Sequence, residues 1–215
     1  MNFEGKKIAG LLLFVGAAQF VLAAIIAEAI DTKYTFLQPM NWLGGGSAGY
    51  IYNSSIFLLG LLIIISAYLL YNSFKGVKNT FSNRLFWFLL TLTGIGAISL
   101  GIFNETFGDA HVFAVRMFWV FSVVTAIISY RFHKKPLSYV SVILGLVSLV
   151  AIILFLSEVY IPSPFDFYLG LGRGGMQRMI QYPTLLWLLG FGAHLTGDSK
   201  SYTNTNPKTP INDSH

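Results

Sequence analysis

Six apolar runs alternate with short polar segments along the chain. A helix rises 1.5 Å per residue, so about 20 apolar residues cross the roughly 30 Å hydrocarbon core of a bilayer. The pattern predicts an all-α fold, a polytopic membrane protein whose six-transmembrane-helix bundle forms one domain over residues 1–197. The predicted spans are residues 8–30, 51–71, 85–103, 111–130, 137–157 and 179–195.

The composition supports a lipid-facing surface. Hydrophobic residues make up 54% of the 215 residues and charged residues only 11%, against about 25% in soluble domains. The chain has no cysteine, which excludes disulfides, thiolate chemistry and Cys-ligated metals. The net charge of +5 would suggest nucleic acid in a soluble protein, but here the position of the charges matters more, and we expect no nucleic-acid partner.

The distribution of Lys and Arg predicts the orientation. With the N-terminus inside, ten of the 14 basic residues fall in inner segments and four in outer segments, as the positive-inside rule requires. Both termini are therefore predicted to be cytoplasmic, in a multi-pass protein of the cell membrane. Residues 198–215 are polar and rich in Asn, Thr and Pro, which predicts a disordered cytoplasmic tail.

One polar stretch, NETFGDAHVFAVR at residues 104–116, separates the third and fourth runs. It carries Glu105, Asp109, His111 and Arg116. An unpaired guanidinium within a membrane helix costs a few kcal/mol, about 3 on the insertion scale. We therefore expect Arg116 either to extend toward the interface or to pair with a carboxylate such as Glu28 or Glu105.

Other polar side chains from neighbouring runs are predicted to meet this stretch near the outer leaflet. Arg178, Gln181 and Tyr182 are spaced i, i+3 and i+4, so they share one helix face. The candidate ligand-binding residues are Asn53, Ser54, Arg116, Arg178 and Gln181. The weak catalytic candidates are His111, Glu28 and Glu105.

Small residues are predicted to bring helices close together. Gly10 and Gly16 in the first run, and Gly94, Gly96 and Gly101 in the third, allow close packing of membrane helices.

Several local patterns resemble the DUF998 family of six-helix prokaryotic membrane proteins, whose function is unknown. They are GAAQFVLAAIIAEAI, LGGG followed by YNSSIFLLGLL, GIGAISLGIFNE, the histidine that opens the fourth run, and GRGGMQRMIQYPTLLWLLGFG. The resemblance covers residues 10–192 and rests on the order and spacing of these motifs. It implies the fold and a membrane location, and it places Glu28, Asn53, Ser54, His111 and Arg178 at family positions. The family often has an acidic residue where this chain has Gln177.

Three functions follow as hypotheses. The first is a small lipid-binding protein, or an accessory or structural subunit of a membrane complex, with membrane lipids and other membrane subunits as partners. The second is a membrane enzyme that acts on a lipid headgroup through His111 and nearby carboxylates. The third is a transporter, which is disfavoured because the inner halves of the helices lack ionisable residues. The outer cluster could also be only a hydrogen-bonded network that fixes helix packing.

No cofactor and no metal are expected. Only one histidine is predicted on the outer side, and no HxxxH or HxxE spacing accompanies it.

Overall fold

The computed structural model describes residues 3–73, 81–132, 135–160 and 168–197, and every regular element within these ranges is a helix. The long helices are α1 Phe3–Ile30, α2 Gly49–Ser73, α3 Phe81–Ile102, α4 Asp109–Ile128, α5 Leu137–Tyr160 and α6 Gly172–Gly197. The short 3-10 helices are η1 Met40–Gly44, η2 Glu105–Phe107 and η3 Ser129–Phe132. The predicted all-α fold is confirmed for these residues, whereas the predicted tail at 198–215 lies outside them.

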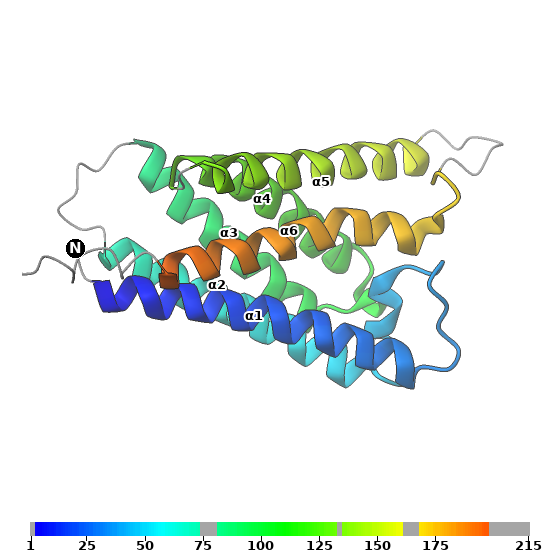
Figure 1. Ribbon diagram of the computed structural model, residues 1–215. Coiled ribbons are helices and arrows are strands. Elements are labelled where there is room, and N and C mark those ends of the chain that lie inside the picture. The colour runs from blue at the N-terminus through cyan, green and yellow to red at the C-terminus, as the bar shows by residue number, and fades with distance from the viewer. Residues whose placement is uncertain (1–2, 74–80, 133–134, 161–167, 198–215) are drawn as a thin grey trace, which may run out of the picture.

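The long helices run alternately in opposite directions, and α6 lies between α1 and α5 (Figure 1). The start of α1 and the end of α6 lie at the same end of the bundle. The opposite end, which we call the η1–η2 end, holds η1, η2 and the start of α6 (Figure 1). This end carries the residues that the sequence placed near the outer leaflet.

Five helices are long and apolar enough to cross a membrane: Glu4–Ile30, Gly49–Ser73, Arg84–Ile102, Asp109–Phe132 and Leu137–Val159. These segments correspond to the first five predicted spans. Many of their large apolar side chains are exposed, as expected for helices that face lipid. The protein is therefore a membrane protein by the length and composition of its helices.

The sixth predicted span, residues 179–195, is not among these five segments. The helix begins earlier, at Gly172, so residues 172–178, which precede the predicted span, are also helical. Its first turns carry Arg173, Gln177, Arg178 and Gln181, which lower its apolarity. Three of these four side chains are buried, so other parts of the protein, and not lipid, surround them.

Glycines bring three helix pairs into close contact. A Cβ atom built on Gly192 of α6 would lie 2.5 Å from the carbonyl oxygen of Gly10 on α1. A Cβ atom on Gly60 of α2 would lie 2.5 Å from the carbonyl oxygen of Gly94 on α3, and one on Gly96 would lie 2.7 Å from a backbone nitrogen of α4. The packing role predicted for Gly10, Gly94 and Gly96 is therefore confirmed.

Candidate functional site

The η1–η2 end contains an ion-pair brace, a small buried cavity and a larger cleft at the side of the bundle, and the cavity and the cleft have several lining residues in common. The single cluster predicted from the sequence is thus divided in the structure.

The brace is centred on Arg178, whose side chain is 4% exposed. Its Nη2 atom forms a salt bridge with Oε1 of Glu28, on the last turn of α1. Nη2 also donates to the hydroxyl of Tyr34 at 3.0 Å, and Nη1 donates to the carbonyl oxygen of Phe36 at 2.9 Å. The guanidinium carbon lies 4.2 Å from the centre of the Phe36 ring. Arg178 therefore joins α1, α6 and the segment between α1 and η1.

This arrangement corrects two expectations. Glu28 has Arg178 as its partner, in place of the Arg116 pairing that the sequence suggested. Arg178 is also enclosed by its own chain, so it serves a different site from Gln181. Burial raises the pKa of the Tyr34 hydroxyl above its ordinary value, although Arg178 opposes the shift. Tyr34 is therefore a neutral member of the brace.

His111 sits in the first turn of α4 and is 6% exposed. Its Nδ1 atom lies 2.8 Å from the carbonyl oxygen of Phe103, and its Nε2 atom lies 2.9 Å from Nδ2 of Asn41. A carbonyl oxygen only accepts, so Nδ1 carries the proton and Nε2 accepts from the Asn41 amide. Both ring nitrogens are therefore bonded to neutral groups of the protein, and neither bond is to a carboxylate.

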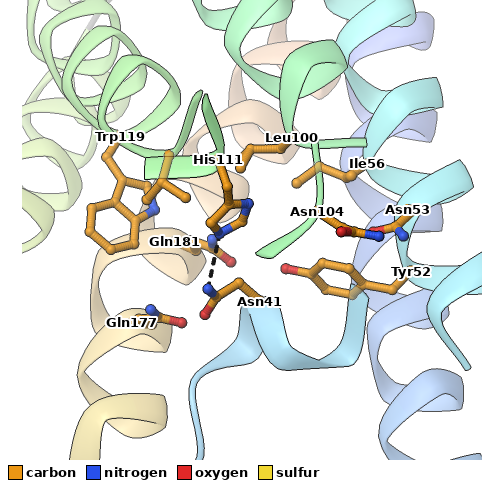
Figure 2. Close-up of a pocket in the computed structure, with 11 residues that line it drawn as sticks. Asn41, Tyr52, Asn53, Ile56, Leu100, Asn104, His111, Trp119, Gln177 and Gln181 are labelled. Atoms are coloured by element: carbon orange, nitrogen blue, oxygen red, sulfur yellow. Dashed lines mark hydrogen bonds between the residues drawn. The ribbon is translucent and has the colours of Figure 1, made fainter. Parts of the chain in front are cut away.

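We call the buried space beside His111 the inner cavity. Its free volume is about 10 Å³, which is the space of about one water-sized group. Figure 2 shows Tyr52, Asn53, Asn104, His111, Trp119 and Gln181 arranged around it. The full lining is Asn41, Tyr52, Asn53, Ile56, Leu100, Asn104, His111, Val115, Trp119, Gln177 and Gln181.

We call the larger space between α4, α5, η1 and the start of α6 the lateral cleft. Its volume is about 290 Å³. Its lining comprises Pro39, Asn41, Trp42, His111, Val112, Val115, Arg116, Trp119, Phe155, Leu156, Val159, Arg173 and Gln177. Two arginines lie on this lining, and none of these described residues is acidic. Aliphatic and aromatic side chains form most of the remaining wall.

The other predicted residues are distributed among these sites or lie apart from them. Asn53 reaches the inner cavity and donates to the carbonyl oxygen of Gly44 at 2.9 Å. Ser54 is exposed and donates to the carbonyl of Tyr50, one turn earlier in its own helix, at 2.6 Å. Ser54 therefore lines neither the inner cavity nor the lateral cleft.

Glu105 lies against the glycine triplet that follows η1. A Cβ atom on Gly45 would lie 2.7 Å from its Oε1 atom. Burial raises the pKa of the Glu105 carboxyl above its ordinary value of 4.5, and His111 partly opposes the shift. Glu105 lines a separate open pocket with Asp31, Lys33 and Tyr34, and it does not line the inner cavity or the lateral cleft.

The lining residues that the sequence did not predict include Asn41, Trp119, Arg173 and Gln177. One signal for them is present in the sequence, because Arg173, Gln177 and Gln181 recur every four residues along α6. Residues at this spacing share one face of a helix. Asn41 lies in a short 3-10 helix and has no such periodic signal.

No protein-family model, characterised protein or solved structure matches this chain. The similarity to the DUF998 family therefore rests on the motifs of the sequence alone.

Proposed function

We propose that this protein binds an anionic membrane lipid in the lateral cleft. The observation that carries the proposal is the position of Arg116 and Arg173 on one apolar cleft at the η1–η2 end. A lipid combines a charged phosphate with an acyl chain, and the cleft offers a surface for each.

The two arginines suit a phosphate group. Arg116 lies in the second turn of α4 and Arg173 in the first turn of α6. Nε of Arg173 donates to the hydroxyl of Tyr168 at 3.3 Å, which orients the guanidinium. Arginine binds phosphate through several N–H groups at once, and such charge-assisted bonds are stronger than neutral ones.

The apolar wall suits an acyl chain. Phe155, Leu156 and Val159 of α5 line the cleft together with Val112 and Val115 of α4. Both helices are apolar enough to lie in a membrane. The cleft would therefore hold the upper part of an acyl chain while the phosphate stays near the helix ends.

The proposal also includes the membrane topology and the location of the protein. We propose six membrane-crossing helices, with α6 as the sixth, cytoplasmic termini and a location in the cell membrane. We also propose, from the sequence motifs, that the chain belongs to the DUF998 family. A lipid-binding protein of this size could serve as an accessory subunit of a membrane complex.

The geometry gives less support to catalysis. The described hydrogen bonds of His111 go to Phe103 and Asn41, and Glu28 is bound to Arg178. A general base needs a lone pair within reach of the proton it removes, and the Nε2 lone pair of His111 is directed at Asn41. The hydrolase and transporter hypotheses therefore remain alternatives without a geometric argument in their favour.

The test measures lipid binding to the purified protein by native mass spectrometry. Phosphatidylglycerol should bind more tightly than phosphatidylcholine with the same acyl chains. Arg116→Gln and Arg173→Gln should each weaken phosphatidylglycerol binding about fivefold, because an exposed charge-assisted contact contributes about 1 kcal/mol.

Arg131→Gln is the matched control, because Arg131 is exposed and lies in η3, beyond the other end of α4. It removes the same charge and should leave phosphatidylglycerol binding unchanged. Equal losses in all three variants would show that only overall charge matters, and the cleft would then not be the site.

A further inference from the structure

Three buried polar atoms on the lining of the inner cavity have no hydrogen-bond partner among the residues that the structure describes. They are Oδ1 of Asn41, Oε1 of Gln181 and Nε1 of Trp119. Gln181 is 5% exposed and Trp119 is 4% exposed. Figure 2 shows the Trp119 nitrogen and the Gln181 side chain on the side that faces His111. Buried polar groups are nearly always bonded, so these three indicate a ligand.

The orientation of Asn41 follows from His111. Nδ1 of His111 donates to the Phe103 carbonyl, and Nε2 lies 2.9 Å from Nδ2 of Asn41, an amide nitrogen that can only donate, so Nε2 accepts from the Asn41 NH₂ group. The carbonyl end of the Asn41 amide is therefore left as an acceptor. Exchanging the two ends of this amide would place two acceptors against each other.

The three atoms together select the chemistry of the ligand. Two acceptors and one N–H donor require a group that both donates and accepts. A hydroxyl oxygen does both, whereas a metal ion or an ammonium group could not accept from Trp119, and an anion would be repelled by the two amide oxygens. The free volume of about 10 Å³ admits one such oxygen.

We propose that the inner cavity is a binding site for one hydroxyl oxygen. The hydroxyl belongs either to a water molecule or to the headgroup of the lipid in the lateral cleft. A lipid headgroup as the source rests on the proposed function. It is sterically reasonable because the inner cavity and the lateral cleft adjoin. The lining residues that they share are Asn41, His111, Val115, Trp119 and Gln177. A headgroup with free hydroxyls, such as glycerol, could then reach from one space into the other.

The first experiment asks whether a hydroxyl is bound at all. Gln181→Met keeps the size of the side chain and removes the acceptor. If Oε1 accepts from a bound hydroxyl, the variant loses that bond and its midpoint of thermal unfolding falls by several degrees. If Oε1 is without any partner, removing it relieves a buried polar group and the midpoint stays the same or rises, which would overturn the proposal.

Ser148→Ala is the matched control. The Ser148 hydroxyl on α5 is also buried without a described partner, but it does not line the inner cavity. Its removal should leave the unfolding midpoint unchanged or raise it. Trp119→Phe provides a second variant in case Gln181→Met fails to fold, and it should lower the midpoint because the lost N–H would no longer donate to the hydroxyl.

The second experiment identifies the source of the hydroxyl. Phosphatidylglycerol is compared with phosphatidylethanol, which carries the same charge and the same acyl chains but no headgroup hydroxyl. If the headgroup supplies the hydroxyl, phosphatidylglycerol binds at least fivefold more tightly to the native protein, and Gln181→Met abolishes the difference. Equal binding of the two lipids supports water as the source.

The two proposals can fail separately. If no anionic lipid binds the native protein, the proposed function is wrong, while the effect of Gln181→Met on the unfolding midpoint still decides the hydroxyl site. If Gln181→Met raises the midpoint while Arg116→Gln weakens binding, the hydroxyl site is wrong and the lateral cleft stands.

Discussion

Replacing Arg178 by Met tests whether this arginine is a structural brace or a ligand-binding group. The substitution keeps a long side chain and removes the charge from a position that is 4% exposed. It breaks the salt bridge to Glu28 and two hydrogen bonds, to Tyr34 and to the Phe36 carbonyl.

The expected cost follows from these contacts. Removing one partner of a buried ion pair costs about 3–5 kcal/mol, because the other charge is left without compensation. Glu28 is 26% exposed and can be partly solvated, so the lower end of this range applies. Loss of the cation–π contact with Phe36, at 4.2 Å, adds about 0.5–1 kcal/mol. We therefore expect Arg178→Met to lower the free energy of unfolding by about 3–4 kcal/mol.

The assay is equilibrium unfolding of the purified protein by SDS titration in mild detergent, followed by the fluorescence of its four tryptophans. Glu28→Gln should cost less, about 1–2 kcal/mol, because the amide oxygen still accepts from the guanidinium. The double variant should cost less than the sum of the two single variants, since both remove the same ion pair.

Arg173→Met is the control for Arg178→Met. It removes the same charge five residues earlier on α6, at an exposed position, and should change the free energy of unfolding by about 0.5 kcal/mol or less. If Arg178→Met also costs less than about 1 kcal/mol, the brace is not needed for stability. The function of Arg178 would then have to be sought in binding.

Two further predictions concern the pH dependence and the number of membrane crossings. Because burial raises the pKa of Glu105, its contribution to stability is full below about pH 4.5 and is lost as the pH rises through the folded-state pKa. Glu105→Gln should therefore raise the unfolding midpoint at pH 7 and not at pH 4, and an equal effect at both pH values would contradict the assignment. The chain has no native cysteine, so Asn2→Cys and Lys208→Cys can each be labelled alone with a membrane-impermeant maleimide. Six crossings place both residues on the cytoplasmic side, labelled only in opened cells, whereas labelling of one of the two in intact cells would indicate an odd number of crossings.

Hydrophobic patterning predicted the helices closely because a helix that faces lipid must carry apolar side chains on its surface. Helices such as α2 and α5 expose apolar side chains all along their length, so a run of apolar residues identifies each of them. The same requirement is weaker for α6, which lies between α1 and α5 and is largely covered by protein. A covered helix can carry residues such as Gln177 and Gln181, which lowers its apolarity.

The site was predicted only in part, because contacts between distant segments do not appear in local patterns. His111, Asn53 and Gln181 were identified, and the structure brings them to one cavity. Asn41 donates to Nε2 of His111 across 70 residues of sequence, while the carbonyl oxygen of Phe103 sets the tautomer of the ring. The turn geometry of η1 that places Asn41 there depends on packing against α6, where Met40 donates to Gln177 at 2.8 Å.

The geometry of α6 explains why the expected single cluster divides into separate sites. Successive residues of an α-helix are rotated by about 100° around its axis. Gln177 and Gln181 therefore share one stripe, which faces the inner cavity, while Arg178 points to a neighbouring stripe, toward α1. The adjacent positions of Gln177 and Arg178 in the sequence thus separate the lining of the inner cavity from the brace. A ligand in the lateral cleft would consequently leave the ion pair with Glu28 intact, so binding and bracing should respond to different substitutions.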